Sequence, residues 1–189
     1  MYKIVQINSS NAKDAELRKL YESSFPKEER IPYDEIVNAL DEMDIDFAGY
    51  YDGDKLLALS LVTHLERFNL GNYLAVQKEL RGKGLGEKFL RMILDKYKEG
   101  KPFIIDVESP LQEDAPNLEI RKRRHAFYIR NGLRDTGVYY TYKGVSYSMM
   151  SLSQEHLLKK ILTKLLLYSV QQWIKCRKTM REFRFPDLF

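Results

Sequence analysis

Three glycines and two cationic side chains lie together in one short stretch of the sequence, Arg81-Gly82-Lys83-Gly84-Leu85-Gly86. An extended apolar run at residues 73–76 precedes the stretch, and apolar residues at helical spacing come after it from Phe89 to Leu94. This order predicts a strand that passes into a helix through a glycine turn. Glycine leaves the backbone open to a ligand, and the first N–H groups of a helix have no internal partner. Such a turn is suited to binding phosphate groups.

The known phosphate-binding motifs differ in the residues that stand after their glycines. A Walker loop needs Ser or Thr after the lysine, but Lys83 is followed by Gly84, and the dinucleotide fingerprint needs a third glycine where Glu87 stands. The pattern Arg-x-x-Gly-x-Gly, formed by Arg81, Gly84 and Gly86, resembles the pyrophosphate-binding motif of the GNAT family of N-acetyltransferases, which use acetyl-coenzyme A (acetyl-CoA). The alternative is an ordinary glycine-rich turn.

A second resemblance to the same family lies further along the chain, at Tyr128-x-x-x-Gly132-Leu133. In GNAT enzymes the corresponding tyrosine lies near the thioester sulfur and protonates the departing thiolate, so the resemblance implies a catalytic role for Tyr128. Core packing is the alternative, because tyrosine is abundant in this chain, with 13 of 189 residues. The resemblance covers about residues 1–152, with its motifs confined to 73–94 and 103–133.

The sequence departs from the family at Arg121, because many members carry an asparagine that contacts the cofactor seven residues before the tyrosine. Arg121 begins a basic cluster that ends at Arg124. Arg124 lies four residues before Tyr128 and therefore on the same helix face. Either arginine could reach a phosphate, while a solvated or salt-bridged helix face is the alternative.

The resemblance implies a set of residues that bind acetyl-CoA as co-substrate. The strand before the turn would pair with the pantetheine arm, and an N–H near Val76 would donate to the thioester oxygen. The expected cofactor-binding residues are Ala75, Val76, Arg81, Gly82, Lys83, Gly84, Leu85, Gly86 and Arg121. No metal site is expected, since the chain has one cysteine, Cys176, and three scattered histidines.

An amine acceptor must lose a proton before it attacks, and a carboxylate can take that proton. Ile104, Asp106 and Glu108 share one face of their predicted strand by period-two alternation. Glu108 is the preferred candidate base, and Asp106 and His64 are the others.

The elements around these motifs predict an α/β fold. Residues 2–7 form a strand, a helix capped by Ser10 or Asn11 comes next, and a second helix spans about 33–42. A hairpin at 45–65 turns at Asp52-Gly53-Asp54, a further turn at 69–72 leads into the strand 73–76, and the next helix ends at 99–100. A parallel strand at 102–107, a helix at 117–130 and a hairpin at 133–152 complete the body. This order matches the GNAT fold, which implies a mixed, mostly antiparallel sheet that splays at the cofactor slot and has helices on both faces.

The chain suits one catalytic domain at residues 1–152 and an appended amphipathic helix and basic tail at 153–189. Residues 154–189 carry eight Lys or Arg and three Asp or Glu, a surplus larger than the net charge of +4, so the basic character belongs to the tail. The apolar face from Leu157 to Ile174 is expected to pack on the body or to form a homodimer. Binding to a membrane surface or to nucleic acid is the less favoured alternative.

Composition, at 44% hydrophobic and 31% charged residues, is that of a globular protein. No apolar run is long enough for a membrane span and the first residues resemble a strand, so a cytoplasmic location is expected. The sequence therefore predicts an acetyl-CoA-dependent N-acetyltransferase acting on a primary amine, carried by a small molecule, peptide or protein. The alternative is an acyl-CoA-binding sensor or adaptor without turnover. The charged loop at 25–30 is either a solvated linker or, as the resemblance implies, part of the acceptor pocket.

Overall fold

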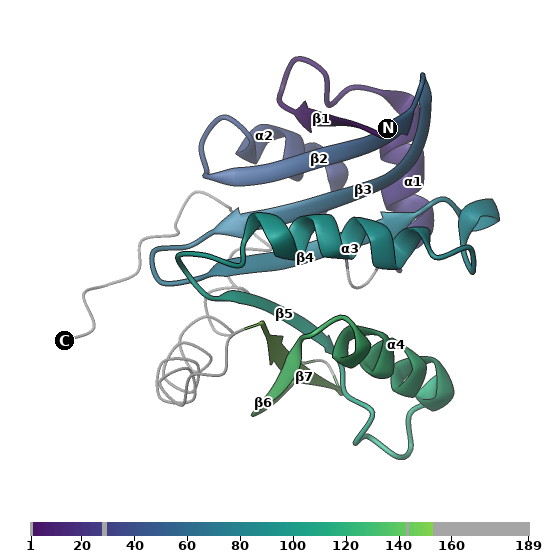
Figure 1. Cartoon of the computed structure of the whole chain (residues 1–189), viewed down its shortest axis with the longest axis vertical. Coiled ribbons are helices and arrows are strands. Elements are labelled where there is room, and N and C mark those ends of the chain that lie inside the picture. The colour runs from purple at the N-terminus through teal and green to yellow at the C-terminus, as the bar shows by residue number, and fades with distance from the viewer. Residues whose placement is uncertain (1, 28–29, 143, 153–189) are drawn as a thin grey trace.

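The computed structural model describes residues 2–27, 30–142 and 144–152. Their secondary-structure elements succeed one another as β1 (Lys3–Ile7), α1 (Ala15–Ser24), α2 (Tyr33–Ala39), β2 (Ile45–Asp52), β3 (Lys55–His64), β4 (Asn69–Val76), the short 3-10 helix η1 (Lys78–Leu80), α3 (Leu85–Lys96), β5 (Phe103–Glu108), α4 (Leu118–Arg130), β6 (Arg134–Tyr142) and β7 (Val145–Ser151). The predicted order of strands and helices is confirmed (Figure 1).

The strands form one mixed sheet in the order β1-β2-β3-β4-β5-β7-β6. Neighbours run antiparallel except β4 and β5, which are parallel and are connected through α3. This arrangement confirms the predicted class, a mostly antiparallel sheet with one parallel crossover. The tail at 153–189, with its expected helix and homodimer contact, lies outside the described residues.

The sheet splays between its two parallel strands. β4 and β5 pair only from Asn69 with Phe103 to Gly71 with Ile105. Beyond that point β5 continues beside β7 as far as Glu108, and β4 continues beside β3 as far as Val76. The remaining residues of β4 and β5 therefore face a gap between the two halves of the sheet. In Figure 1 the half made of β1–β4 lies above, and β5–β7 with α4 lies below.

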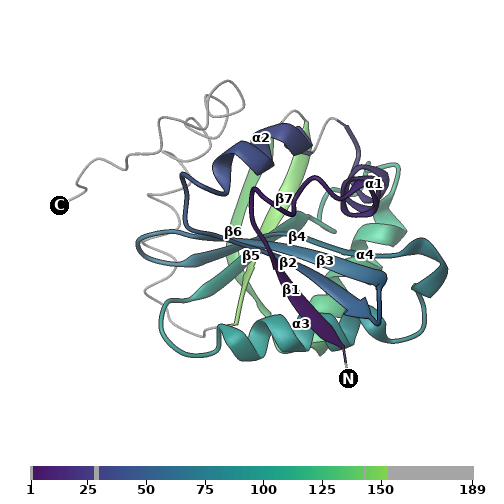
Figure 2. The same ribbon diagram turned by 90° about the horizontal axis from the view of Figure 1, so that it is seen from above.

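Helices cover both faces of the sheet (Figure 2). On one face Phe89, Leu90 and Ile93 of α3 form a core with buried strand residues, and Phe127 and Tyr128 of α4 pack against it. On the other face Leu17, Leu20 and Tyr21 of α1, with Tyr33 and Ile36 of α2, pack on β2–β4. Side chains alternate along each strand, so Leu74 and Val76 point to the α3 face while Tyr73 and Ala75 point to the α1 face.

The cap of one helix and the ends of two others differ from the prediction. Helix α1 is capped by Asp14, whose carboxylate accepts from the N–H of Glu16 and Leu17 at 2.7 and 3.3 Å, whereas Asn11 stabilises the preceding turn. Helix α2 ends at Ala39 and α3 at Lys96, earlier than predicted.

The turn predicted at residues 69–72 lies instead at 65–68. The N–H of Leu65 donates to the carbonyl of Phe68 at 2.9 Å, and Phe68 is buried against Ile104. Burial of this ring returns the chain to the sheet at Asn69. The register of β4 shifts between Gly71 and Tyr73, so that Asn72 is the extra residue of a β-bulge.

Candidate active site

The glycine turn has the backbone of an anion site. Gly82 and Gly84 both have φ of 77°, a conformation that L side chains rarely adopt, and Gly84 is the N-cap of α3 without a side-chain cap. The first N–H groups of α3 thus point out of the helix end, where the dipole favours negative charge. Residues 81–84 are exposed to solvent. The turn predicted from the sequence therefore forms a cradle of this kind at the end of β4.

The space around Gly86 indicates whether the protein's own packing or a ligand requires glycine at this position. A Cβ built on this residue would come no closer than 3.9 Å to Val76 Cγ2 and 4.0 Å to Phe127 Cζ, which is ordinary van der Waals contact. Packing within the protein therefore does not demand glycine here, although glycine in a helix costs up to about 1 kcal/mol relative to alanine. A ligand lying against the backbone would explain why Gly86 carries no side chain. The turn therefore fits a pyrophosphate group.

Arg81 joins the cradle to the end of β4. Its Nε donates to the carbonyl of Val76 at 3.0 Å, and its Nη2 donates to Ser24 Oγ at 3.3 Å. Both contacts leave the exposed guanidinium beside the turn, where further N–H groups can meet an anion. Lys83 is also exposed.

The edge of β4 that faces the splay is identified by the pairing of β3 with β4. The N–H of Gln77 donates to the carbonyl of Leu57 at 2.9 Å. Hydrogen-bonded pairs alternate in an antiparallel ladder, so Ala75, opposite Leu59, also directs its polar groups at β3. Leu74 and Val76 then direct theirs into the splay. Of the two strand residues predicted to bind cofactor, Val76 directs its backbone groups into the splay and Ala75 does not. Leu74, which also faces the splay, was not among the predicted residues.

A pocket lies in the splay and brings Tyr128 and Asp106 together. Its lining includes Asn72, Tyr73 and Leu74 of β4, Ile105 and Asp106 of β5, Leu90 and Ile93 of α3, and Tyr128 of α4. Burial raises the pKa of Tyr128 above its ordinary value, an effect that Arg124 opposes and Asp106 increases. Tyr128 is therefore a neutral hydroxyl at pH 7, able to donate a hydrogen bond inside the pocket.

Asp106 is a half-buried carboxylate that lines this pocket. Burial raises its pKa, and a hydrogen bond from the hydroxyl of Tyr140 to Oδ2 acts in the opposite direction. Ile105 and Val107 join the core under α3, so alternation puts Asp106 on the face that carries α1 and α2. Tyr128, on α4, thus meets the pocket from one face and Asp106 from the other.

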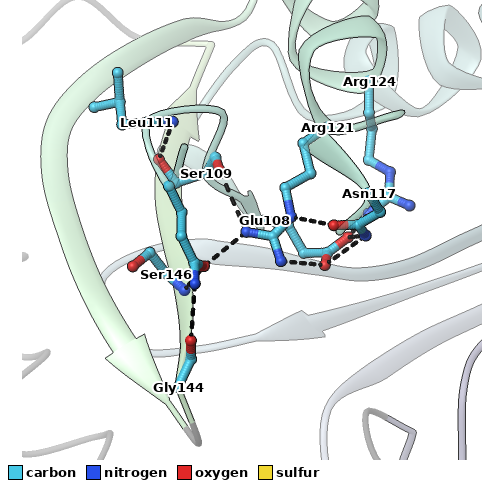
Figure 3. A network of polar contacts seen from close by, with 9 residues as sticks. Glu108, Ser109, Leu111, Asn117, Arg121, Arg124, Gly144 and Ser146 are labelled. Atoms are coloured by element: carbon cyan, nitrogen blue, oxygen red, sulfur yellow. Dashed lines mark hydrogen bonds and ion pairs between the residues drawn. The ribbon is translucent and has the colours of Figure 1, made fainter. Parts of the chain in front are cut away.

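Glu108, the preferred base of the sequence analysis, has different surroundings (Figure 3). Its Oε1 is 3.0 Å from Arg121 Nη2 and its Oε2 is 2.9 Å from Arg124 Nη1. Asn117 Nδ2 donates to both carboxylate oxygens at 3.0 and 3.3 Å. With only 6% of its surface exposed, this carboxylate is enclosed by cations. Its contacts are those of a structural ion pair, and they give an acceptor amine no access.

Arg121, predicted as a cofactor ligand, is 3% exposed and belongs to the same network. Its Nε donates to Asn117 Oδ1 at 2.7 Å, and its Nη1 donates to Gln112 Oε1 at 2.8 Å and weakly to the carbonyl of Ser109. Gln112 in turn accepts from the N–H of Ser146. Arg121 therefore joins α4 to the loop after β5 and to β7, and binding a phosphate would require breaking these contacts.

The third candidate base, His64, does not line the pocket. Its Nδ1 is 2.8 Å from Asn69 Oδ1, and its Nε2 is 3.4 Å from Asp46 Oδ2. These partners join β2, β3 and β4, which gives His64 a place in the sheet and not in the splay.

The loop after α1 packs on the pocket through its aromatic residue. The ring of Phe25 is 4.7 Å from that of Tyr73, and the N–H of Ile31 donates to the Tyr73 hydroxyl at 3.1 Å. Tyr73 itself lines the pocket. The described parts of the loop therefore do more than link two helices. Three residues at or beside the pocket were not among those predicted from the sequence, Tyr73, Asn72 and Tyr140, and only alternation along β4 pointed to Tyr73.

Structural comparison places the chain among known folds. A GNAT-family protein from Bacteroides thetaiotaomicron matches it with a TM-score of 0.69 at 23% identity, over 87% of this chain and 96% of that one. The ribosomal-protein-S18-alanine N-acetyltransferase from Escherichia coli matches with a TM-score of 0.59 at 15% identity, over 80% and 93% of the two chains. A Bacillus subtilis acetyltransferase in complex with CoA matches with a TM-score of 0.58 at 14% identity, over 82% and 100%. The chain has the GNAT fold.

Comparison of the sequence with protein-family models and with curated proteins gave no match. Within the part of the chain that the structure describes, no three His, Cys, Asp or Glu residues gather as a metal site. Among the same residues, no helix has the length and apolarity to cross a membrane.

Proposed function

We propose that this protein is an N-acetyltransferase that moves the acetyl group of acetyl-CoA to a primary amine. The observation that carries the proposal is the placement of a phosphate cradle at the end of β4 and of a tyrosine hydroxyl and a carboxylate in the splay beside that strand. The GNAT fold supports the same reaction class, and the Bacillus subtilis protein with this fold was solved with CoA.

The pyrophosphate of acetyl-CoA would lie on the backbone of residues 82–86, with Arg81 and Lys83 beside it. The pantetheine arm would run along the open edge of β4 as an added strand, paired with the backbone of Leu74 and Val76. This route leads the thioester from the cradle into the pocket that contains Tyr128. One of the N–H groups on the open edge would then stabilise the oxygen of the tetrahedral intermediate.

Tyr128 would assist departure of the thiolate. The departing thiolate, whose thiol has a pKa near 8.5, is a weaker base than the tyrosinate of Tyr128, because burial raises the pKa of that tyrosine. Complete proton transfer from Tyr128 to the sulfur is therefore uphill. The hydroxyl instead donates a hydrogen bond to the sulfur and gives up its proton as the amine nitrogen supplies another. Because thiolate leaves readily, positioning of the two substrates contributes more than this donor.

The test is an assay of thiol release from acetyl-CoA in the presence of a panel of primary amines. The proposal expects thiol release that depends on the amine, together with a matching acetylated product in mass spectrometry. Calorimetry on the same sample measures acetyl-CoA binding. Tight binding without turnover on any amine would instead indicate an acyl-CoA sensor, and lack of binding would contradict both functions.

A further inference from the structure

Among the described residues that line the pocket, Asp106 is the one whose side chain carries a negative charge when ionised. Its side-chain partner in the described part of the chain is the neutral hydroxyl of Tyr140. Glu108, two residues further along β5, is instead neutralised by two arginines. A partly desolvated carboxylate with no cation beside it among the described residues is unfavourable when charged, and a bound cation would stabilise its charged form.

Aromatic rings stand on both sides of this carboxylate. Tyr140, which contacts Asp106, stacks on Tyr147 with ring centroids 5.1 Å apart and planes 13° from parallel. Across the splay Tyr73 lines the same pocket, and Phe25 packs against it. Ring faces attract an ammonium group and also accommodate the apolar carbons that carry it.

We infer that Asp106, held by Tyr140, binds the ammonium group of the acceptor and takes its proton, and that this acceptor is a primary ammonium on an apolar or aromatic body. The inference rests on the proposed transferase function and adds the substrate class and the proton acceptor. The position of Asp106 on the face opposite α3 lets the amine approach the thioester from the side of α1, while Tyr128 lies on the side of α4.

Protons and bonds balance in this transfer. One proton passes from the ammonium group to Asp106, and the freed lone pair forms a C–N bond with the carbonyl carbon of the thioester. The C–S bond breaks with its electrons going to sulfur, which takes the Tyr128 proton, while the second proton of the nitrogen returns to the tyrosine oxygen. Asp106 then releases its proton to water, so that ammonium and acetyl-CoA become amide, free thiol and one proton.

The surroundings of Asp106 suit a base. An alkylammonium with a pKa near 10.4 gives a proton to an ordinary carboxylate at a cost of about 1.36 kcal/mol per unit of pKa difference. Burial raises the pKa of Asp106 and reduces this difference, and Tyr140 keeps the ionised form accessible by donating to it. Tyr73 on β4 and Tyr128 on α4 also line the pocket, and burial raises the pKa of the Tyr128 hydroxyl.

The first experiment replaces Asp106 by asparagine, which keeps the shape and the acceptor for Tyr140. The probe amine is 2-phenylethylamine, and phenylalanine, which adds a carboxylate to the same body, is the matched control ligand. We expect Asp106→Asn to bind acetyl-CoA within about twofold of wild type but to lose amine-dependent turnover by about 100-fold or more. Wild type should acetylate 2-phenylethylamine in preference to phenylalanine, because Asp106 repels the added carboxylate.

The second experiment measures kcat/KM against pH. Activity of the wild type should fall on the acid side at a pH above the ordinary carboxyl value of 3.8, because burial raises the pKa of Asp106. Tyr140→Phe removes the hydrogen bond that lowers this pKa, so the acid limb should move to higher pH. Tyr139→Phe is the control, since this neighbouring ring is 47% exposed and pairs with Ser148 on the other face of the sheet.

Three results would overturn the inference. These are wild-type turnover in a folded Asp106→Asn protein, acid limbs that coincide in Tyr140→Phe and Tyr139→Phe, and preference for phenylalanine over 2-phenylethylamine. Each leaves the transferase function standing. A wild-type protein that binds acetyl-CoA and acetylates no amine would contradict the proposed function itself, and that failure is visible before any variant is made.

Discussion

Asp106 and Glu108 stand two residues apart on β5, and their partners give them opposite properties. Glu108 is surrounded by Arg121, Arg124 and Asn117, whereas Asp106 accepts, within the described part of the chain, a side-chain hydrogen bond from the hydroxyl of Tyr140. A carboxylate that is already paired stabilises the fold and has little capacity left for a substrate proton. A partly desolvated carboxylate with no cation among the described residues destabilises the fold, a cost that proteins accept at functional sites.

Gly86→Ala tests the cradle with the least disturbance. The structure has room for the added methyl group, and alanine favours the helix, so the free energy of unfolding should rise by up to about 1 kcal/mol. The same methyl would meet a pyrophosphate on the backbone, and we expect acetyl-CoA affinity to fall about tenfold, equivalent to about 1.4 kcal/mol. Calorimetry and chemical denaturation measure the two effects.

Arg91→Ala is the control for this variant, since Arg91 is an exposed α3 residue paired with Glu87 on the same helix. It should leave acetyl-CoA affinity unchanged. If Gly86→Ala binds acetyl-CoA as tightly as wild type, the ligand does not lie against this backbone.

Tyr128→Phe removes only the tyrosine hydroxyl and tests whether that group takes part in catalysis. The ring and its packing against Phe127 remain, so stability and acetyl-CoA affinity should change little. Only the donor to the sulfur is lost, and we expect kcat to fall by about 100-fold, near the lower end of general acid–base effects, with KM for acetyl-CoA unchanged. Steady-state kinetics with a working amine would show this, and an unchanged kcat would leave Tyr128 as a packing residue.

At the residue scale the sequence predicted the candidates but not their surroundings. Alternation along β5 predicted that Asp106 and Glu108 share a face, and the glycine pattern predicted the turn that leads into α3. The partners that distinguish the two carboxylates, Tyr140 and Arg121, lie on β6 and α4, and their contacts depend on how these elements pack. Local spacing carries no information about such contacts.

At the scale of elements, the Glu108 network joins four parts of the second half of the sheet. Arg121 and Arg124 come from α4, Glu108 ends β5, Gln112 lies in the loop after it, and Ser146 belongs to β7. Helix α4 also carries Tyr128. The network, drawn in Figure 3, therefore fixes the position of this helix and with it that of the tyrosine.

Glu108→Gln should destabilise the protein strongly. It leaves Arg121 buried with its charge unpaired, and removing one partner of a buried ion pair costs about 3–5 kcal/mol. Denaturation in urea would measure the loss. The control is Glu119→Gln on α4, the helix that carries Arg121. It breaks a pair with Lys122 in which both side chains are exposed, and it should change the free energy of unfolding little. Equal midpoints for the two variants would show that the buried network does not stabilise the fold.

Helices and strands were predictable as elements, while their junctions were less so. The sequence patterns predicted each α-helix and strand of the body, but not the short helix η1 (Lys78–Leu80), and the turn at 65–68 was predicted too late in the sequence. Asn69, Gly71 and Asn72 are typical of turns, yet burial of Phe68 and pairing with β3 hold them in β4. Asn72 instead forms the bulge, and Thr63 Oγ1 donates to its Oδ1 at 2.7 Å.

At the scale of the whole molecule, the two halves of the sheet are joined by three residue pairs between β4 and β5. This short junction leaves the pocket open, and helices on both faces contribute to its surroundings. The proposed cofactor route along β4 and the inferred acceptor site at Asp106 thus meet where the backbone ladder ends.

The tail at residues 153–189 carries a broad apolar face in its sequence, from Leu157 to Ile174. Such a face is too wide to leave in water, so we expect it to dock on the body or on a second copy of the chain. Truncation after Leu152 should then lower solubility or change the mass measured by sedimentation. If the truncated protein keeps the oligomeric state and the Tm of the full chain, the tail does not dock on the body or on a second copy, which would point to another partner.

Acid stability depends on a contact that joins the cradle helix to the first half of the sheet. Asp46 of β2 accepts hydrogen bonds from Lys96, the last residue of α3, and from the hydroxyl of Tyr97. Burial acts to raise the pKa of Asp46, but the bonds from Lys96 and Tyr97 outweigh it and hold the pKa below the ordinary value of 3.8. The unfolded chain therefore binds a proton at higher pH than the folded protein does.

This difference in proton binding sets the direction of the pH effect. The stability that Asp46 contributes is complete at neutral pH and is lost as pH falls through its lowered folded pKa. Asp46→Asn should thus lower the Tm at pH 7, and the gap to wild type should narrow below about pH 4. Asp106→Asn should behave oppositely, because a raised folded pKa makes wild type lose stability as pH rises above 3.8. Thermal melts from pH 3 to pH 7 compare the three proteins, and a gap for Asp46→Asn that widens in acid would contradict the assignment of Lys96 and Tyr97 as partners of the ionised carboxylate.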